Sequence, residues 1–143
     1  MNISSSGGTD RASEPKRIAV AVVERDGQFL IGQRPPGVAL AGLWEFPGGK
    51  VEPDESAPEA AARECLEETG LPVEPVGELS KVTQQYAHGL VEISFIACRP
   101  IGDGSASSMR LHSPFRWVAR TDLARYEFPA ANAAIVERLI QGG

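Results

Sequence analysis

The amino-acid sequence predicts an α+β fold in which a mixed β-sheet lies between α-helices. Two segments with strand character come first, a helix with clear start and stop signals follows, and a second strand pair and a second helix end the chain. A length of 143 residues suits one domain with its own core. We expect residues 1–16, which include a run of Ser and Gly, to be a disordered tail and residues 17–143 to form the domain.

The first two predicted strands are joined by a tight turn. Residues 18–23 form a continuous apolar run, which is typical of a strand that is buried on both faces. Asp26 and Gly27 signal the turn, and residues 29–31 continue as the second strand. Residues 36–46 then form a long loop, and loops of that length often carry function.

The first helix has both of its ends encoded in the sequence. Ser56 and Glu59 form a capping box with Pro58 in the first turn, and Gly70 supplies a left-handed stop. Small and apolar residues between 60 and 66 allow this helix to pack closely on a sheet.

The second half of the chain continues as strands and a final helix. Residues 76–85 and 91–99 are predicted to pair as a hairpin, and residues 115–118 form a short strand. We expect Thr121 to cap a short helical turn. Residues 130–140 form an amphipathic helix.

Composition and charge limit the classes of partner. A net charge of −5 argues against a nucleic-acid polymer. The early apolar run is too short to span a membrane, and no leader is apparent. Cys65 and Cys98 lie among apolar neighbours, which favours two buried thiols over a disulfide. We therefore expect a cytoplasmic monomer or homodimer that acts on a small molecule.

Three glutamates share one flank of the first helix. Glu64 lies one turn before Glu67 and Glu68, so their carboxylates can converge. Converging like charges destabilise a protein unless a cation lies between them, and Mg²⁺ prefers such oxygen ligands. The alternative is a solvated acidic face without function.

The segment that contains these glutamates resembles the Nudix box, G-x5-E-x7-R-E-U-x-E-E-x-G-U, where U is a bulky apolar residue. The positions in register are Gly49, Glu55, Arg63, Glu64, Glu67, Glu68, Gly70 and Leu71. Cys65 stands where the family usually has Leu, Ile or Val. The resemblance implies the Nudix fold, an α/β/α sandwich, and an enzyme that hydrolyses a nucleoside diphosphate linked to another moiety.

The same resemblance implies roles for the charged residues. Mg²⁺, or Mn²⁺ as an alternative, would be bound by Glu64, Glu67 and Glu68, with the carbonyl of Gly48 completing the inner ligand set. Glu64 is a candidate general base by proximity, and Arg63 would orient the glutamates. Glu55 would brace the entry to the helix, with an outer role at the metal as the alternative.

Segments outside the box resemble the MutT-type enzymes, which remove oxidised guanine nucleotides such as 8-oxo-dGTP. Residues 43–50 are similar to their LEFPGGK segment, Arg34 stands where they have a phosphate-contacting Arg, and residues 128–132 resemble their FPPAN segment. The implied substrate-binding residues are Arg34, Glu45, Phe46, Pro47, Gly48 and Asn132. For Asn132 the alternative is a helix cap.

Three positions depart from the MutT pattern. Gly89 replaces an Arg that helps to hold the oxidised base, Ala39 replaces a loop His, and Leu111 replaces a further acidic metal ligand. We therefore expect hydrolysis of a nucleoside triphosphate to monophosphate and pyrophosphate, in a nucleotide-pool-sanitising role linked to DNA repair. The alternatives are a cytidine or pyrimidine triphosphate, a broader nucleoside diphosphate substrate range, and a non-catalytic nucleotide-binding domain.

Other aromatic and histidine side chains have simpler expected roles. Tyr86 either stacks on a base or packs within its hairpin. Trp44 and Trp117 are expected to anchor the core or a loop, and His88 and His112 to be solvated.

Overall fold

A computed structural model describes residues 15–102, 111–112 and 114–142. Of the predicted tail, only residues 15 and 16 are described, and Lys16 already belongs to the first strand. The elements are β1 (Lys16–Arg25), β2 (Gln28–Gln33), β3 (Trp44–Glu45), β4 (Gly48–Lys50), α2 (Ala57–Thr69), β5 (Val73–Tyr86), β6 (Gly89–Pro100), β7 (Arg116–Ala119), the 3₁₀ helices η1 (Arg120–Arg125) and η2 (Ala130–Asn132), and α4 (Ala133–Ile140).

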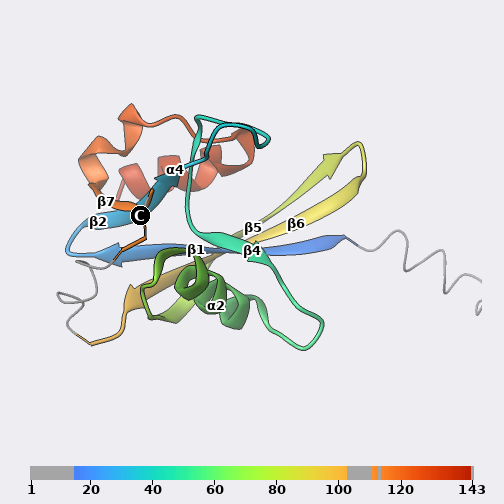
Figure 1. Ribbon diagram of the computed structural model, residues 1–143, viewed down its shortest axis with the longest axis horizontal. Helices are drawn as coiled ribbons and strands as arrows, with labels where there is room; N and C mark the ends of the chain where they lie inside the picture. The colour runs from blue at the N-terminus through green and yellow to red at the C-terminus, as the bar shows by residue number, and fades with distance from the viewer. Residues whose placement is uncertain (1–14, 103–110, 113, 143) are drawn as a thin grey trace, which may run out of the picture.

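The strands form one mixed sheet, as predicted. Its order is β3-β2-β1-β6-β5, with β4 paired to β1 and β7 paired to β2. The β1–β6 pair is parallel and the other pairs are antiparallel. Helix α2 covers one face, and α4 with the 3₁₀ helices covers the other (Figure 1). The α/β/α arrangement is thereby confirmed.

Strand β1 separates two hydrophobic cores, which explains its unbroken apolar sequence. Ala19, Ala21 and Val23 pack on the α2 side. Val22 is buried on the α4 side, where Ile18 and Val20 pack at the edge of the same core. Because successive side chains of a strand point to opposite faces, both sets must be apolar.

Strands β3 and β4 were not predicted, and they determine where the site lies. They are two and three residues long and are held by distant partners, since β3 pairs with β2 and β4 pairs with β1. The turn between β1 and β2 was predicted correctly, and both Asp26 and Gly27 have positive φ angles.

Two local predictions near the C-terminus are corrected. Thr121 does not cap a helix, because η1 begins at Arg120 and Ala119 occupies the capping position without a side-chain bond. The backbone N–H of Arg120 instead donates to Gly27 O at 2.9 Å, so a tertiary contact sets the start. The predicted helix over residues 130–140 is divided into η2 and α4, with Asn132 at the junction.

The thiol prediction is confirmed, since Cys65 and Cys98 are both free and buried. Within the described ranges, no helix has the length and apolar character needed to cross a membrane.

Candidate active site

Helix α2 presents the acidic side chains because both of its ends are fixed. Ser56 Oγ accepts from Glu59 N at 3.2 Å, and Glu59 Oε1 accepts from Ser56 N at 2.9 Å. Gly70 takes the left-handed conformation with φ +79° and ends the helix. These capping bonds confirm the predicted helix and set the position of its glutamates relative to the sheet.

Arg63 is the centre of a cluster of ion pairs. Its guanidinium donates to both oxygens of Glu55, at 2.6 and 2.9 Å, and to Glu64 Oε2 at 3.1 Å. It also donates to Glu67, at 3.3 Å, and to the carbonyl of Lys50, at 3.0 Å. The hydrogen bonds from Arg63 are the main reason that the pKa of Glu55 is held down at about 2. Arg63 thus ties the acidic loop to the helix, and Glu55 lies where a brace would lie.

Glu68 has a different environment. Its Oε1 faces the backbone N–H of Gly48 at 3.4 Å. Burial raises the pKa of Glu68 to about 7; the hydrogen bond from Gly48 lowers it, and the nearby charges of Glu64 and Glu45 raise it further. The ion pairs among the described residues of this cluster run to Glu55, Glu64 and Glu67, and none of them reaches Glu68. Glu68 is therefore a partly buried carboxylate without a paired cation.

Gly48 and Gly49 allow β4 to pass between β1 and the glutamates. A Cβ on Gly49 would lie 2.4 Å from Glu64 Cδ, and a Cβ on Gly48 would lie 2.5 Å from Ala19 O. A side chain at Gly48 would push β4 away from β1, and a side chain at Gly49 would displace the Glu64 carboxylate. The backbone of β4 therefore lies directly against the carboxylates.

The three predicted glutamates do not have equivalent positions. Glu64 and Glu68 both contact β4, whereas the Glu67 side chain is 57% exposed and contacts Arg63. Within the described part of the chain, no three His, Cys, Asp or Glu side chains form a ready-made metal cluster. The oxygen donors of Glu64 and Glu68, one of them partly buried and lacking a paired cation, fit a hard divalent cation.

Arg34 and Glu45 form the second charged pair of the site. Arg34 Nη1 lies 2.7 Å from Glu45 Oε1, and its Nε donates to Ala39 O at 2.7 Å. The backbone of Arg34, at the start of its loop, is also bonded to Gly42 and Leu43 at the end of the same loop. Arg34 consequently holds the loop over residues 34–43 beside the glutamates.

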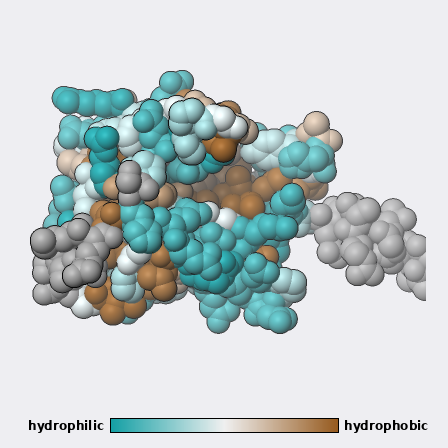
Figure 2. All heavy atoms as spheres, in the orientation of Figure 1, coloured by the Kyte–Doolittle hydropathy of each residue, from teal (hydrophilic) through white to brown (hydrophobic). Residues whose placement is uncertain are grey.

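A cleft of about 250 Å³ opens next to Gly48 and Gly49. The predicted substrate-binding residues that line it are Arg34, Glu45, Phe46, Gly48 and Asn132. Pro47 does not line the cleft, because it is buried and its carbonyl accepts from Ala21 N. Asn132 makes no side-chain capping bond, although it stands at the start of α4. Figure 2 shows a hydrophobic recess over the middle of the sheet, between more polar surfaces above and below it.

Sequence reasoning missed most of the apolar residues of the cleft. Ile18 and Val20 on β1, Ile93 on β6 and Leu40 on the loop all line it. The alternation of β1 places Ile18 and Val20 on one face, but only the assembled sheet shows that this face is the cleft. Tyr86, for which two roles remained open, also lines the cleft.

Trp44 and two of the three departures from the MutT pattern have structural roles. Trp44 packs edge-on against Tyr126 with a centroid distance of 4.7 Å, in agreement with an anchoring role. Ala39 supplies the carbonyl that Arg34 binds, and Leu111 packs against the core under α2. Gly89 has φ +131°, and a Cβ there would meet no atom within 4 Å.

Comparison with known proteins places this geometry in context. A model of the NUDIX domain matches residues 18–138. The CTP pyrophosphohydrolase of Escherichia coli K12 is 35% identical over 120 residues, which cover 84% of this chain and 87% of that protein. An 8-oxo-dGTP diphosphatase of Proteus vulgaris is 35% identical over 54% of this chain and 70% of its own length.

Solved structures of related proteins have the same fold over most of this chain. The E. coli ORF135 protein superimposes with a TM-score of 0.73 and 26% identity, and the match covers 92% of each chain. The MutT protein from Methanosarcina mazei Go1 superimposes with a TM-score of 0.71 and 27% identity, over 90% of this chain and 96% of that one.

Proposed function

The chain belongs to the Nudix hydrolase family, and from this premise we propose that it hydrolyses a (deoxy)nucleoside triphosphate to the monophosphate and pyrophosphate with Mg²⁺. Mn²⁺ is the alternative metal. The observation that carries the proposal is the partly buried, unpaired Glu68, which lies beside Glu64 and Gly48 at a cleft lined by Asn132. A site that only binds a neutral ligand gains nothing from such a carboxylate.

We assign separate roles in metal binding, positioning and proton transfer to the residues of the site. Glu64 and Glu68 would hold the metal together with the backbone of Gly48, and Glu67 would act from the exposed edge of the same helix. When bound, Mg²⁺ supplies charge neutralisation for the diphosphate and activates water. Arg63 keeps Glu64 and Glu67 in place, and Glu64 is the proposed acceptor of the proton from the attacking water.

The remaining residues would bind the nucleotide. Arg34 and Glu45 line the cleft as a charged pair and would face the phosphates, and Phe46 contributes apolar surface. Asn132 also lines the cleft, with its amide free of a capping bond, and would face the base, since an amide can pair with a base edge through one donor and one acceptor. We propose an 8-oxo-dGTP-like substrate on this basis, with a nucleotide-pool-sanitising role in DNA repair in the cytoplasm.

A cytidine triphosphate is the second candidate. Gly89 offers no side chain to the base, and a relative that is 35% identical over 84% of this chain is named a CTP pyrophosphohydrolase. Two further alternatives are a broader range of nucleoside diphosphate derivatives as substrates and a non-catalytic nucleotide-binding role.

The test is pyrophosphate release from 8-oxo-dGTP, dGTP, CTP, dCTP and a nucleotide sugar, with Mg²⁺ and with EDTA. We expect EDTA to abolish turnover and 8-oxo-dGTP to exceed dGTP by about a hundredfold in kcat/KM, or about 2.7 kcal/mol. Glu68→Gln should lower kcat/KM on the order of 10³-fold, whereas Glu52→Gln, a matched change at an exposed position of the acidic loop, should leave it unchanged. Turnover that survives EDTA, or equal activity of Glu68→Gln and Glu52→Gln, would contradict the metal mechanism, and a preference for CTP would contradict the oxidised-guanine substrate.

A further inference from the structure

A second cavity adjoins the nucleotide cleft. It has a volume of about 450 Å³ and shares four lining residues with the cleft, namely Leu40, Tyr86, Pro129 and Ala131. These four residues come from the loop, from the tip of the β5–β6 hairpin and from the segment before α4. The two hollows therefore meet along a common rim, and a ligand in the cleft can extend into the second cavity.

The common rim is held in place from two sides. The ring of Tyr86 stacks on that of His88, with a centroid distance of 5.5 Å and an interplanar angle of 10°. Leu40 has φ +60°, which is unusual for a leucine, and its carbonyl accepts from Leu43 N at 3.1 Å. Its side chain is nevertheless 55% exposed. Strain of this kind is found where a loop is shaped for a ligand.

The second cavity joins the cleft at the end that would hold the base. Ala131, on the shared rim, directly precedes Asn132. Arg34, Glu45 and Gly48, the cleft residues that would face the phosphates and the metal, do not line this cavity. A group that enters it would therefore extend from the nucleobase, and not from the phosphate chain.

The side chains that line the second cavity favour an uncharged, apolar group. Leu43, Phe128 and Ala130 add apolar surface to the shared rim. Glu127 is the one charged residue among the described residues that line the cavity. A phosphate or carboxylate would meet this acid without a compensating arginine or lysine, whereas an uncharged apolar group would gain free energy by leaving water.

We propose that this cavity is a subsite for an apolar substituent on the nucleobase, so that the enzyme accepts base-adducted nucleoside triphosphates. The inference rests on the proposed function, because it assumes that the nucleotide occupies the cleft. It names a substrate class that differs from the parent nucleotides by an added apolar group on the base.

The experiment compares each parent nucleotide with its benzyl derivative: dATP with N6-benzyl-dATP, dCTP with N4-benzyl-dCTP, and dGTP with O6-benzyl-dGTP. A 4-carboxybenzyl derivative of each base has nearly the same shape and tests the effect of charge. The variants are Ala130→Trp, which fills the second cavity from an exposed position, and Ala124→Trp, which makes the same change at an exposed position on η1.

We expect the wild-type protein to hydrolyse at least one benzyl derivative with a kcat/KM within about tenfold of its parent. Ala130→Trp should lower the ratio of benzyl derivative to parent by about tenfold or more, and Ala124→Trp should leave it unchanged. The carboxybenzyl derivative should be hydrolysed about tenfold less well than the benzyl one. Rejection of every benzyl derivative by the wild type, or equal ratios for the two variants, would overturn the proposal.

Failure of the proposed function is distinguishable from failure of the subsite. If no parent triphosphate is hydrolysed with Mg²⁺, the proposed function fails. Calorimetric binding of the corresponding monophosphates then tests the subsite: weaker binding of the benzyl compound to Ala130→Trp than to Ala124→Trp supports it, and equal binding refutes it.

Discussion

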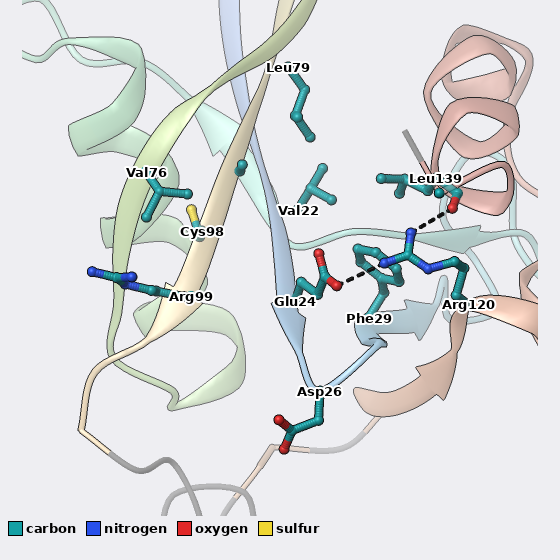
Figure 3. A pocket seen from close by; sticks show the side chains of 12 residues that line it. Val22, Glu24, Asp26, Phe29, Val76, Leu79, Cys98, Arg99, Arg120 and Leu139 are labelled. Carbon is teal, nitrogen blue, oxygen red and sulfur yellow. Dashed lines mark hydrogen bonds and ion pairs between the residues drawn. The ribbon is translucent and has the colours of Figure 1, made fainter.

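Two cavities of this protein differ in volume and in how their charged side chains are paired, and the larger one is not the candidate active site. The cavity in Figure 3 has a volume of about 350 Å³ and is larger than the 250 Å³ cleft at the glutamates. Its arginines, Arg120 and Arg99, are paired with Glu24 and Glu74, and its remaining charged side chain, Asp26, is exposed to solvent. The cleft, in contrast, has Glu68 beside it, a carboxylate with a raised pKa and no paired cation. The two cavities therefore differ in a partly buried carboxylate without a paired cation, and this feature, not volume, is the reason to place the candidate active site at the cleft.

The pairing in the larger cavity is visible in Figure 3, where Arg120 lies between Glu24 on β1 and Leu139 on α4. Its guanidinium contacts Glu24 Oε2 at 2.8 Å and donates to Leu139 O at 2.9 Å. Arg99 pairs with Glu74 across the β5–β6 ladder. The Arg120 contacts hold α4 on the sheet and the Arg99 pair links β5 to β6, so both have a structural role.

The largest expected difference between the two cavities comes from removing one carboxylate charge in each. Glu68→Gln should lower kcat/KM on the order of 10³-fold, about 4 kcal/mol, because the metal would lose a ligand. Glu24→Gln should leave kcat/KM unchanged, because Glu24 only pairs with Arg120. Steady-state pyrophosphate release measures both. A comparable loss in the two variants would remove the functional distinction between the cavities.

A smaller effect is expected when an arginine is shortened in each region. Arg63→Lys should lower kcat by about 10- to 100-fold, because lysine cannot reproduce the paired bonds to Glu55. Arg99→Lys alters an exposed pair and should leave kcat unchanged. An Arg63→Lys enzyme with normal kcat and Mg²⁺ dependence would show that Arg63 does not position the glutamates.

The charged contacts in the larger cavity should contribute to folding stability and not to activity. Arg120→Ala should lower the free energy of unfolding by about 1–2 kcal/mol, because it removes the contacts to Glu24 and Leu139 O. Arg125→Ala, at an exposed side chain with a 3.8 Å pair, is the control and should change it by less than about 0.5 kcal/mol. Urea unfolding measures both values. A loss of activity in the folded Arg120→Ala protein would contradict the structural role.

The smallest effect concerns the pH dependence of the metal-free protein. The pKa of Glu68 is raised from 4.5 to about 7 in the folded state, so the folded protein binds this proton more tightly than the unfolded chain does. The resulting stabilisation is complete below pH 4.5 and is lost as the pH rises through about 7. The wild type should therefore lose stability relative to Glu68→Gln as the pH rises from 4.5 to about 7, by on the order of 1 kcal/mol in the free energy of unfolding.

Thermal unfolding measured across this pH range in EDTA tests the last prediction, with a shift of about 2–4 °C expected. Adding Mg²⁺ should stabilise the wild type at high pH and leave Glu68→Gln unaffected. A difference between the two proteins that does not change with pH would show that Glu68 keeps an ordinary pKa.

Much of the fold could be predicted from the sequence because its signals are local. The capping box at Ser56, the glycine stop at Gly70 and the Asp26-Gly27 turn each depend on a few adjacent residues, and all three are confirmed. Strands β3 and β4 carry no local signal, because they exist only through pairing with β2 and β1. The start of η1 was missed for the same reason, since Arg120 bonds to the distant Gly27.

The sequence by itself determined which side chains α2 presents, since residues three and four apart share a face of a helix. The tertiary structure decided what each of them contacts. The close approach of β4 at Gly48 and Gly49 places Glu64 and Glu68 against backbone, and the reach of Arg63 holds Glu67 at the exposed edge. The cleft and its neighbouring cavity also depend on the assembled fold, because Tyr86, Leu40 and Asn132 are distant in the chain and meet only when the sheet is complete.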